Sequence, residues 1–191
     1  MASNQERYRQ QQLNHALIEA AKQGSLADIQ SLLDRHADIN AFDCYNSHTP
    51  LHYASQNGHH QCIELLLDRH ANVDTLGRCD NNTPLHHASM NGNHRCIELL
   101  LDRHANINAL DTDNCTPLHF AAMSGHHQCI EILLDRQAEA NIQGYNNITP
   151  LHLASSIGNR QCIEILLDYG ADKSLINVRL SLSQHMQASL S

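Results

Sequence analysis

Residues 49–73 read TPLHYASQNGHHQCIELLLDRHANV, and most of this stretch returns several times along the chain. The tetrapeptide Thr-Pro-Leu-His begins at Thr49, Thr83, Thr116 and Thr149, so that successive copies are 34, 33 and 33 residues apart. An earlier segment, residues 17–40, keeps the rest of the pattern without the tetrapeptide. A fixed period of this length is typical of repeat arrays, and the sequence therefore predicts five units.

Each unit is expected to form two short helices. A Thr before a Pro places an N-cap hydroxyl next to the residue best suited to the first helical position. Residues 50–57 then give about two turns, and Gly58 suits the left-handed conformation that ends a helix. A second helix is expected over 60–69, with apolar Cys62, Ile63, Leu65, Leu66 and Leu67. Isolated helices shorter than about 12 to 15 residues are marginal in water, so the units must stack into an all-α solenoid.

These residues resemble the ankyrin repeat, whose hallmark is Thr-Pro-Leu-His, then Ala, Gly, an Ile/Leu-rich helix and an Ala-Asp/Asn-Val/Ile-Asn tail. The likeness covers about residues 13–172. It implies helix-turn-helix units with β-turn fingers that project at a right angle and form a concave face. It also implies that His52, His86, His119 and His152 bond to the Thr hydroxyl and neighbouring backbone in a structural role.

The domain boundaries follow from the repeat. We expect a polar N-terminal extension over 1–12 and five units over about 13–45, 46–79, 80–112, 113–145 and 146–174. Residues 175–191 are expected to form a degenerate capping half-repeat and tail, because His185 lies 33 residues beyond His152. His87 stands where the other units carry a larger apolar or aromatic residue, which predicts that unit three is the weakest.

Two sets of positions depart from the ankyrin pattern. The Gly that follows the second helix survives as Gly170, whereas the other units carry His36, His70, His104 and Gln137. The Gly of the finger is replaced by Ser47, Asn81, Asn114 and Asn147. If these positions still need a positive φ, Asn and His tolerate it better than β-branched residues do.

The 16 His and 7 Cys raise the question of a metal site. Stacked helices lie about 8 to 10 Å apart, so Cys62 and Cys96 of successive units cannot share an ion whose bonds are about 2.0 to 2.3 Å long. Cys62 also falls on the buried stripe, where a thiol acts as a small hydrophobe. We expect no metal and no cofactor, and we expect the turn histidines to be solvated; these are His59, His60, His94, His126 and His127.

Composition narrows the function. The 12 Lys and Arg against 20 Asp and Glu give a formal net charge of −8, which offers no basic surface for nucleic acid. No apolar run approaches the roughly 20 residues of a membrane span, and the opening MASNQERYRQQQ lacks the apolar core of a secretory signal. An odd number of cysteines without framework spacing indicates a reducing compartment. We expect a cytoplasmic chain, or one in the host cell cytoplasm if it is a bacterial effector.

Catalysis has no support in the sequence. We find no Gly-rich phosphate loop, no Gly-x-Ser-x-Gly elbow and no Cys-x-x-Cys pair. The abundant reactive residue types recur in register, as residues of a scaffold do. We therefore expect a non-enzymatic protein-protein interaction scaffold.

Variation between the units concentrates in the fingers and at the ends of the first helices. The resemblance places these positions on the concave contact surface, which predicts that they bind a partner protein. The predicted contact residues are Phe42, Tyr45, His48, Gln56, Leu76, Asp80, Asn82, Met90, Asn91, Leu110, Thr112, Asp113, Met123, Tyr145, Asn146 and Ile148. Asp80, Asp111 and Asp113 make the centre acidic and favour a basic or extended segment on the partner.

Three alternatives stay open at this point. The chain could be the targeting module of a larger or secreted effector protein of an intracellular bacterium, with the activity elsewhere. The turn histidines could make a surface that responds to pH or metal. Self-association through the exposed turns is also consistent with the sequence.

Overall fold

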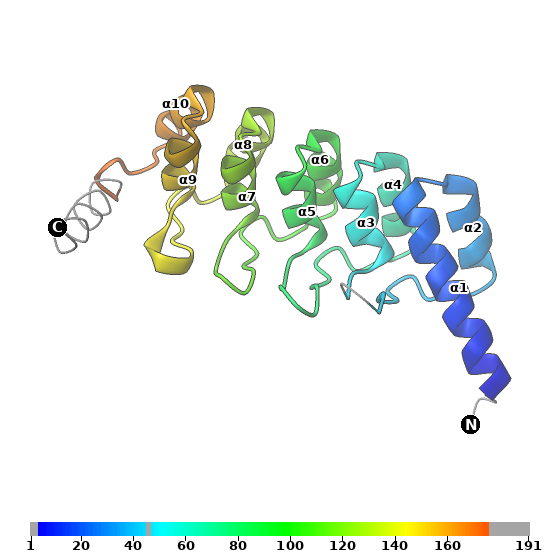
Figure 1. Ribbon diagram of the computed structural model, residues 1–191. Coiled ribbons are helices and arrows are strands. Elements are labelled where there is room, and N and C mark those ends of the chain that lie inside the picture. The colour runs from blue at the N-terminus through cyan, green and yellow to red at the C-terminus, as the bar shows by residue number, and fades with distance from the viewer. Residues whose placement is uncertain (1–3, 45–46, 176–191) are drawn as a thin grey trace.

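The computed structural model describes residues 4–44 and 47–175. Within these residues the chain forms ten α-helices, one short 3-10 helix and no β-strand. The helices pair into five units that stack side by side in chain order (Figure 1). The prediction of an all-α solenoid is confirmed. None of the helices in the described part of the chain is long and apolar enough to cross a membrane.

Each unit contains a first and a second helix. The first helices are α1 (Asn4–Gln23), α3 (Pro50–Gln56), α5 (Pro84–Met90), α7 (Pro117–Ser124) and α9 (Pro150–Ile157). The second helices are α2 (Leu26–Asp34), α4 (His60–Asp68), α6 (His94–Asp102), α8 (His127–Asp135) and α10 (Arg160–Asp168). The 3-10 helix η1 (Tyr145–Asn147) lies in the loop before α9. The loops that lead from one unit to the next project to one side of the helices (Figure 1).

The first helix begins within the segment predicted as a polar N-terminal extension. This segment supplies the first turns of α1, which therefore runs for 20 residues. Leu13 and Leu17 anchor this helix in the core, whereas Tyr8 is 63% exposed. The predicted capping half-repeat, apart from Leu175, lies outside the described residues.

The Thr-Pro-Leu-His motif starts each later first helix with a capping box. In α3 the backbone N–H of Thr49 donates to Nδ1 of His52 over 3.0 Å, and the Thr49 hydroxyl lies 2.9 Å from the same nitrogen. Because Nδ1 accepts a hydrogen bond, Nε2 carries the ring proton and donates to the carbonyl of Asn82 in the next loop, over 2.9 Å. The structural role that the resemblance implied for this histidine is confirmed.

The other three motifs repeat this arrangement. Nε2 donates from His86 to the carbonyl of Cys115, from His119 to that of Ile148 and from His152 to that of Leu175, over 3.1, 3.1 and 2.7 Å. Burial lowers the pKa of His52 and of His86 to about 4, and it also lowers the pKa of His119. The rings of His52, His86 and His119 are therefore neutral near pH 7 and can hold this bonding pattern.

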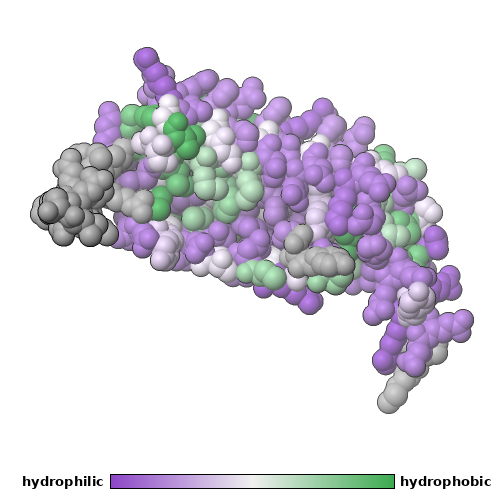
Figure 2. Space-filling view, in the orientation of Figure 1, coloured by the Kyte–Doolittle hydropathy of each residue, from purple (hydrophilic) through white to green (hydrophobic). Residues whose placement is uncertain are grey.

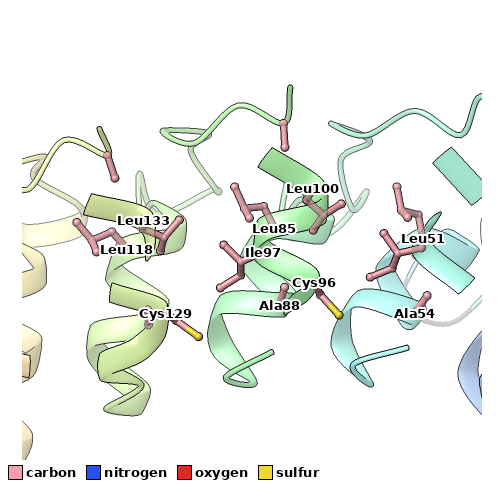
Figure 3. Packing of buried hydrophobic residues seen from close by; sticks show 14 of the residues in the cluster. Leu51, Ala54, Leu85, Ala88, Cys96, Ile97, Leu100, Leu118, Cys129 and Leu133 are labelled. Carbon is pink, nitrogen blue, oxygen red and sulfur yellow. The ribbon is translucent and has the colours of Figure 1, made fainter. Parts of the chain in front are cut away.

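The core repeats the same side chains from unit to unit. Leu51, Leu85 and Leu118 occupy one position of successive first helices, and each is at most 1% exposed. Cys96 and Cys129 lie at the same place in successive second helices (Figure 3). Burial raises the pKa of both thiols to about 12. The cysteines of the second helices thus act as small core residues, as predicted for Cys62.

Positive φ angles occur at both sets of positions where the ankyrin pattern has a glycine and this chain has another residue. The residues after the second helices are His36, His70, His104 and Gln137, with φ of 65°, 66°, 64° and 69°. In the loops, Ser47, Asn81, Asn114 and Asn147 have φ of 55° to 58°. The left-handed conformation of the ankyrin pattern is therefore kept without its glycines.

The turns between paired helices link neighbouring units, which corrects one expectation. His59 and His126 are not simply solvated, because their Nε2 atoms lie 3.0 and 3.1 Å from the carbonyls of Lys22 and Met90 in the preceding unit. Asn93 and Asn159 make the equivalent contacts in the other two junctions. Gly92 admits this approach, since a Cβ there would lie 2.8 Å from the His126 ring.

Candidate functional site

The loops that precede the later first helices form four fingers, defined here as residues 43–48, 77–82, 111–115 and 144–148. One backbone hydrogen bond closes each finger, and the four donors are Asp43, Gly77, Asp111 and Gly144, with distances of 2.8 to 3.0 Å. The first two fingers are one residue longer than the last two, which accounts for the difference between periods of 34 and 33.

Backbone hydrogen bonds also join each finger to its neighbour. The N–H of Arg78 donates to Ser47 over 3.4 Å, that of Thr112 to Asp80 over 3.0 Å, and that of Tyr145 to Asp113 over 2.7 Å. The four fingers therefore form a linked row, and these bonds hold the backbone of the row before any partner arrives.

Apolar side chains are exposed along this row. Leu76 and Leu110 occupy equivalent positions at the base of successive fingers and are 48% and 46% exposed. Phe42 holds the same position one unit earlier, and the guanidinium of Arg78 covers its ring at 4.2 Å from the centroid. Tyr145 at the last finger is 63% exposed and Met123 at the end of α7 is 46% exposed. The side of the molecule seen in Figure 1 is largely hydrophilic, with apolar patches toward both ends of the stack (Figure 2).

The remaining predicted contact residues divide by exposure. Asn91, Thr112, Asp113 and Asn146 are exposed, whereas Gln56, Met90 and Ile148 are partly buried. Tyr45 lies outside the described residues. The exposed group can offer hydrogen bonds and one carboxylate at the rim of a contact surface.

Three of the predicted contact residues turn into the stack. His48 and Asn82 are only 8% and 7% exposed, so they offer little area to a partner. The Asp80 carboxylate accepts hydrogen bonds from the backbone N–H and the amide of Asn82, over 3.0 and 2.8 Å. Burial alone would raise the pKa of Asp80, but these bonds and the nearby His48 and His87 lower it overall. Asp80 therefore contributes less to an outward acidic surface than expected.

Asp111 is also held internally, because its Oδ1 accepts from the backbone N–H groups of Asp113 and Cys115 over 2.9 and 2.7 Å. Partial burial raises the pKa of this carboxyl. Asp113 is the member of the predicted acidic group that remains exposed.

His48, Asp80 and His87 come together at the junction between units two and three. One ligand atom from each lies within 4.8 Å of the others, and this is the single group of potential metal ligands among the described residues. The His48 ring stacks on His52 at 5.0 Å and meets the His87 ring edge-on at 4.6 Å. Burial, with smaller contributions from the neighbouring rings, lowers the pKa of His87 to about 3.

The sequence did not indicate this cluster. His87 was noted as an unusual residue within its helix, and His48 was assigned to the contact surface. The available signal was that both depart from the repeat at positions that a junction brings together. The repeat period does not specify the direction in which the His48 side chain leaves its finger, so the contact with His87 could not be predicted from it.

The comparisons agree with the fold. A family model described as ankyrin repeats (3 copies) matches residues 17–111 and 103–177. A search of curated proteins found no match to this chain.

Proposed function

This chain belongs to the ankyrin-repeat family, and from that premise we propose that it binds a partner protein across its fingers and the ends of its first helices. Ankyrin repeats are generally protein-protein interaction modules and are typically non-enzymatic. The proposed contact surface consists of Leu76, Leu110, Met123 and Tyr145, with Asn91, Thr112, Asp113 and Asn146 beside them.

The exposed apolar row is the observation that carries this proposal. Leu76, Leu110, Met123 and Tyr145 are each 46% to 63% exposed. Fully burying a side chain of this size from full exposure is worth about 1.5 to 3 kcal/mol, and roughly half of that remains to be gained by side chains that are about half exposed. Because backbone hydrogen bonds already join the fingers, little ordering entropy opposes that gain.

The chemistry of the partner follows from the charges around the row. The chain has a formal net charge of −8, and Asp113 stands exposed in the third finger. A basic or extended segment with apolar anchors would complement both features, since opposite charges favour association and orient the partner.

A substitution test can use residues that the repeat itself supplies. Gln143 occupies the position of Leu76 and Leu110 in the last finger, and Ser156 occupies the position of Met123 in α9. We would combine Leu76→Gln, Leu110→Gln and Met123→Ser, and compare this variant with the parent chain in affinity capture followed by mass spectrometry. Circular dichroism would establish that both are equally helical.

The control removes exposed apolar surface elsewhere. Tyr169, which follows α10, is 44% exposed and stands where the other units carry Arg, and Leu26 on α2 is 42% exposed. We expect Tyr169→Arg with Leu26→His to retain the partner that the triple variant loses. Equal capture by the triple variant and the parent chain would contradict the proposed surface.

A further inference from the structure

Two departures from the repeat meet at the junction between units two and three. His48 holds the finger position that is Asn82, Cys115 and Ile148 in later units. His87 holds the helix position that is Tyr53, Phe120 and Leu153 elsewhere. Since His48 reaches from its own finger toward the next unit, its ring meets the His87 ring edge-on, with the Asp80 carboxylate beside them.

The distances are close to those of a metal site. Nε2 of His48 lies 3.6 Å from Oδ2 of Asp80, and the ligand atoms of all three residues lie within 4.8 Å of one another. An ion with four ligands at about 2.0 to 2.2 Å places neighbouring ligand atoms roughly 3.3 Å apart. Side-chain rotations that bring the widest pair about 1.5 Å closer would complete this geometry.

The histidine nitrogens are buried without hydrogen-bond partners. Both ring nitrogens of His48 and Nε2 of His87 lack a partner, and the two residues are 8% and 6% exposed. A buried polar atom left unpaired costs about 1 to 3 kcal/mol. The motif histidine His52, by contrast, bonds through both nitrogens. The lone pairs of His48 and His87 are thus available to an ion.

The surroundings of the cluster are also suited to an ion. Asn82 holds the Asp80 carboxylate through two hydrogen bonds, as outer-shell partners of metal ligands do. Gly77 leaves space, because a Cβ there would lie 3.2 Å from Nε2 of His48 and still closer to the Asp80 carboxylate.

We propose that His48, Asp80 and His87 bind a divalent transition-metal ion of the zinc class, with water as the remaining ligand. Two imidazoles and one carboxylate suit borderline ions such as Zn²⁺, whereas Ca²⁺ and Mg²⁺ prefer sites built from oxygen alone. The ion joins the finger of unit two to the finger and first helix of unit three. Ion binding would explain why His48 and His87 differ from the residues at the equivalent positions of the other units.

The test measures Zn²⁺ binding to the full chain after treatment with a chelator, in the presence of a reductant. Isothermal titration in a competing chelator would separate one tight site from weak binding by exposed histidines. Co²⁺ serves as a second probe, because its visible absorption reports the coordination geometry. We expect one ion per chain, four-coordinate, with a rise in melting temperature.

Three single variants remove one ligand each. The new residue is either one that an equivalent position of the repeat already carries or one of the same shape as the residue it replaces. The variants are His87→Phe, which copies Phe120, His48→Asn, which copies Asn82, and Asp80→Asn. Each should weaken Zn²⁺ binding by at least about 100-fold, since loss of an outer-shell partner alone costs about 10- to 100-fold. His87→Phe should fold as well as the parent, so that lost binding cannot reflect unfolding.

The control is His126→Asn with His127→Arg, which removes two turn histidines and copies Asn159 and Arg160. This variant should keep the tight site. The proposal is overturned if the parent chain retains no ion against the competing chelator. It is equally overturned if His87→Phe and Asp80→Asn bind Zn²⁺ as tightly as the parent, or if only the control loses the ion.

Discussion

Replacing His70, His104 and Gln137 with glycine should stabilise the chain. These residues follow second helices with φ of 66°, 64° and 69°, and their side chains are exposed. A left-handed conformation costs a non-glycine residue about 1 to 2 kcal/mol, whereas glycine loses about 0.5 to 1 kcal/mol more conformational entropy on folding. The net gain is roughly 0.5 to 1 kcal/mol per site, and about 1.5 to 3 kcal/mol for the triple variant if the separate units contribute additively.

The reverse change isolates the backbone contribution. Gly170 has φ of 84° at the equivalent position, and no atom lies within 4 Å of where its Cβ would be. Gly170→His should therefore cost about as much as one glycine gains elsewhere. Glu98→Gly, an exposed change inside α6, is the matched control and should cost about 1 kcal/mol because ordinary helical φ gives glycine no advantage.

Urea unfolding followed by circular dichroism would measure these differences in the free energy of unfolding. The midpoint should rise for the triple variant and fall for Gly170→His and Glu98→Gly, at an unchanged m-value. A triple variant no more stable than the parent, together with a neutral Gly170→His, would refute the argument from positive φ.

Three further predictions concern burial and the junctions. The pKa of His86 falls from 6.5 to about 4 on folding, so the unfolded chain binds more protons between these values. Stability should be complete above about pH 6.5 and decline toward pH 4, by on the order of 3 kcal/mol for this histidine, in urea titrations at several pH values with a chelator present. A thiol reagent should modify the exposed Cys79 in the folded chain and reach the buried Cys96 only after unfolding, as peptide mapping would show. Gly92→Ala should destabilise the chain more than Gly158→Ala in urea unfolding, because both have positive φ but a ring of the next unit lies 2.8 Å from a Cβ at Gly92 and nothing lies within 4 Å at Gly158.

The repeat predicted the features that depend on residues close in sequence. Thr49 and His52 are three residues apart, so their capping contact follows from the motif. The positive φ after each second helix follows in the same way, because the family pattern marks it with a glycine. The order of helices and their stacking then depend on a period that the sequence shows directly.

Contacts between units were harder to predict. His59 and His126 looked like surface residues, yet both reach carbonyl groups of the preceding unit. His48 and Asp80 lie 32 positions apart and meet through the shapes of two fingers. Side-chain direction within a finger depends on its turn geometry, and neither composition nor periodicity specifies it.

The contacts between units also determine how such a chain can grow. The histidines of the first three Thr-Pro-Leu-His motifs each bind a backbone carbonyl of the next finger, and the carbonyl is present whatever side chain the finger carries. A duplicated unit would thus find the same backbone contacts on both of its sides. A tandem duplication would therefore need no new interface. The junction of units two and three is different, since there the side chain of His48 lies beside Asp80 and His87 of the next unit. If these two units were separated, the three residues would no longer lie together, so this cluster depends on the order of the units whereas the other junctions do not.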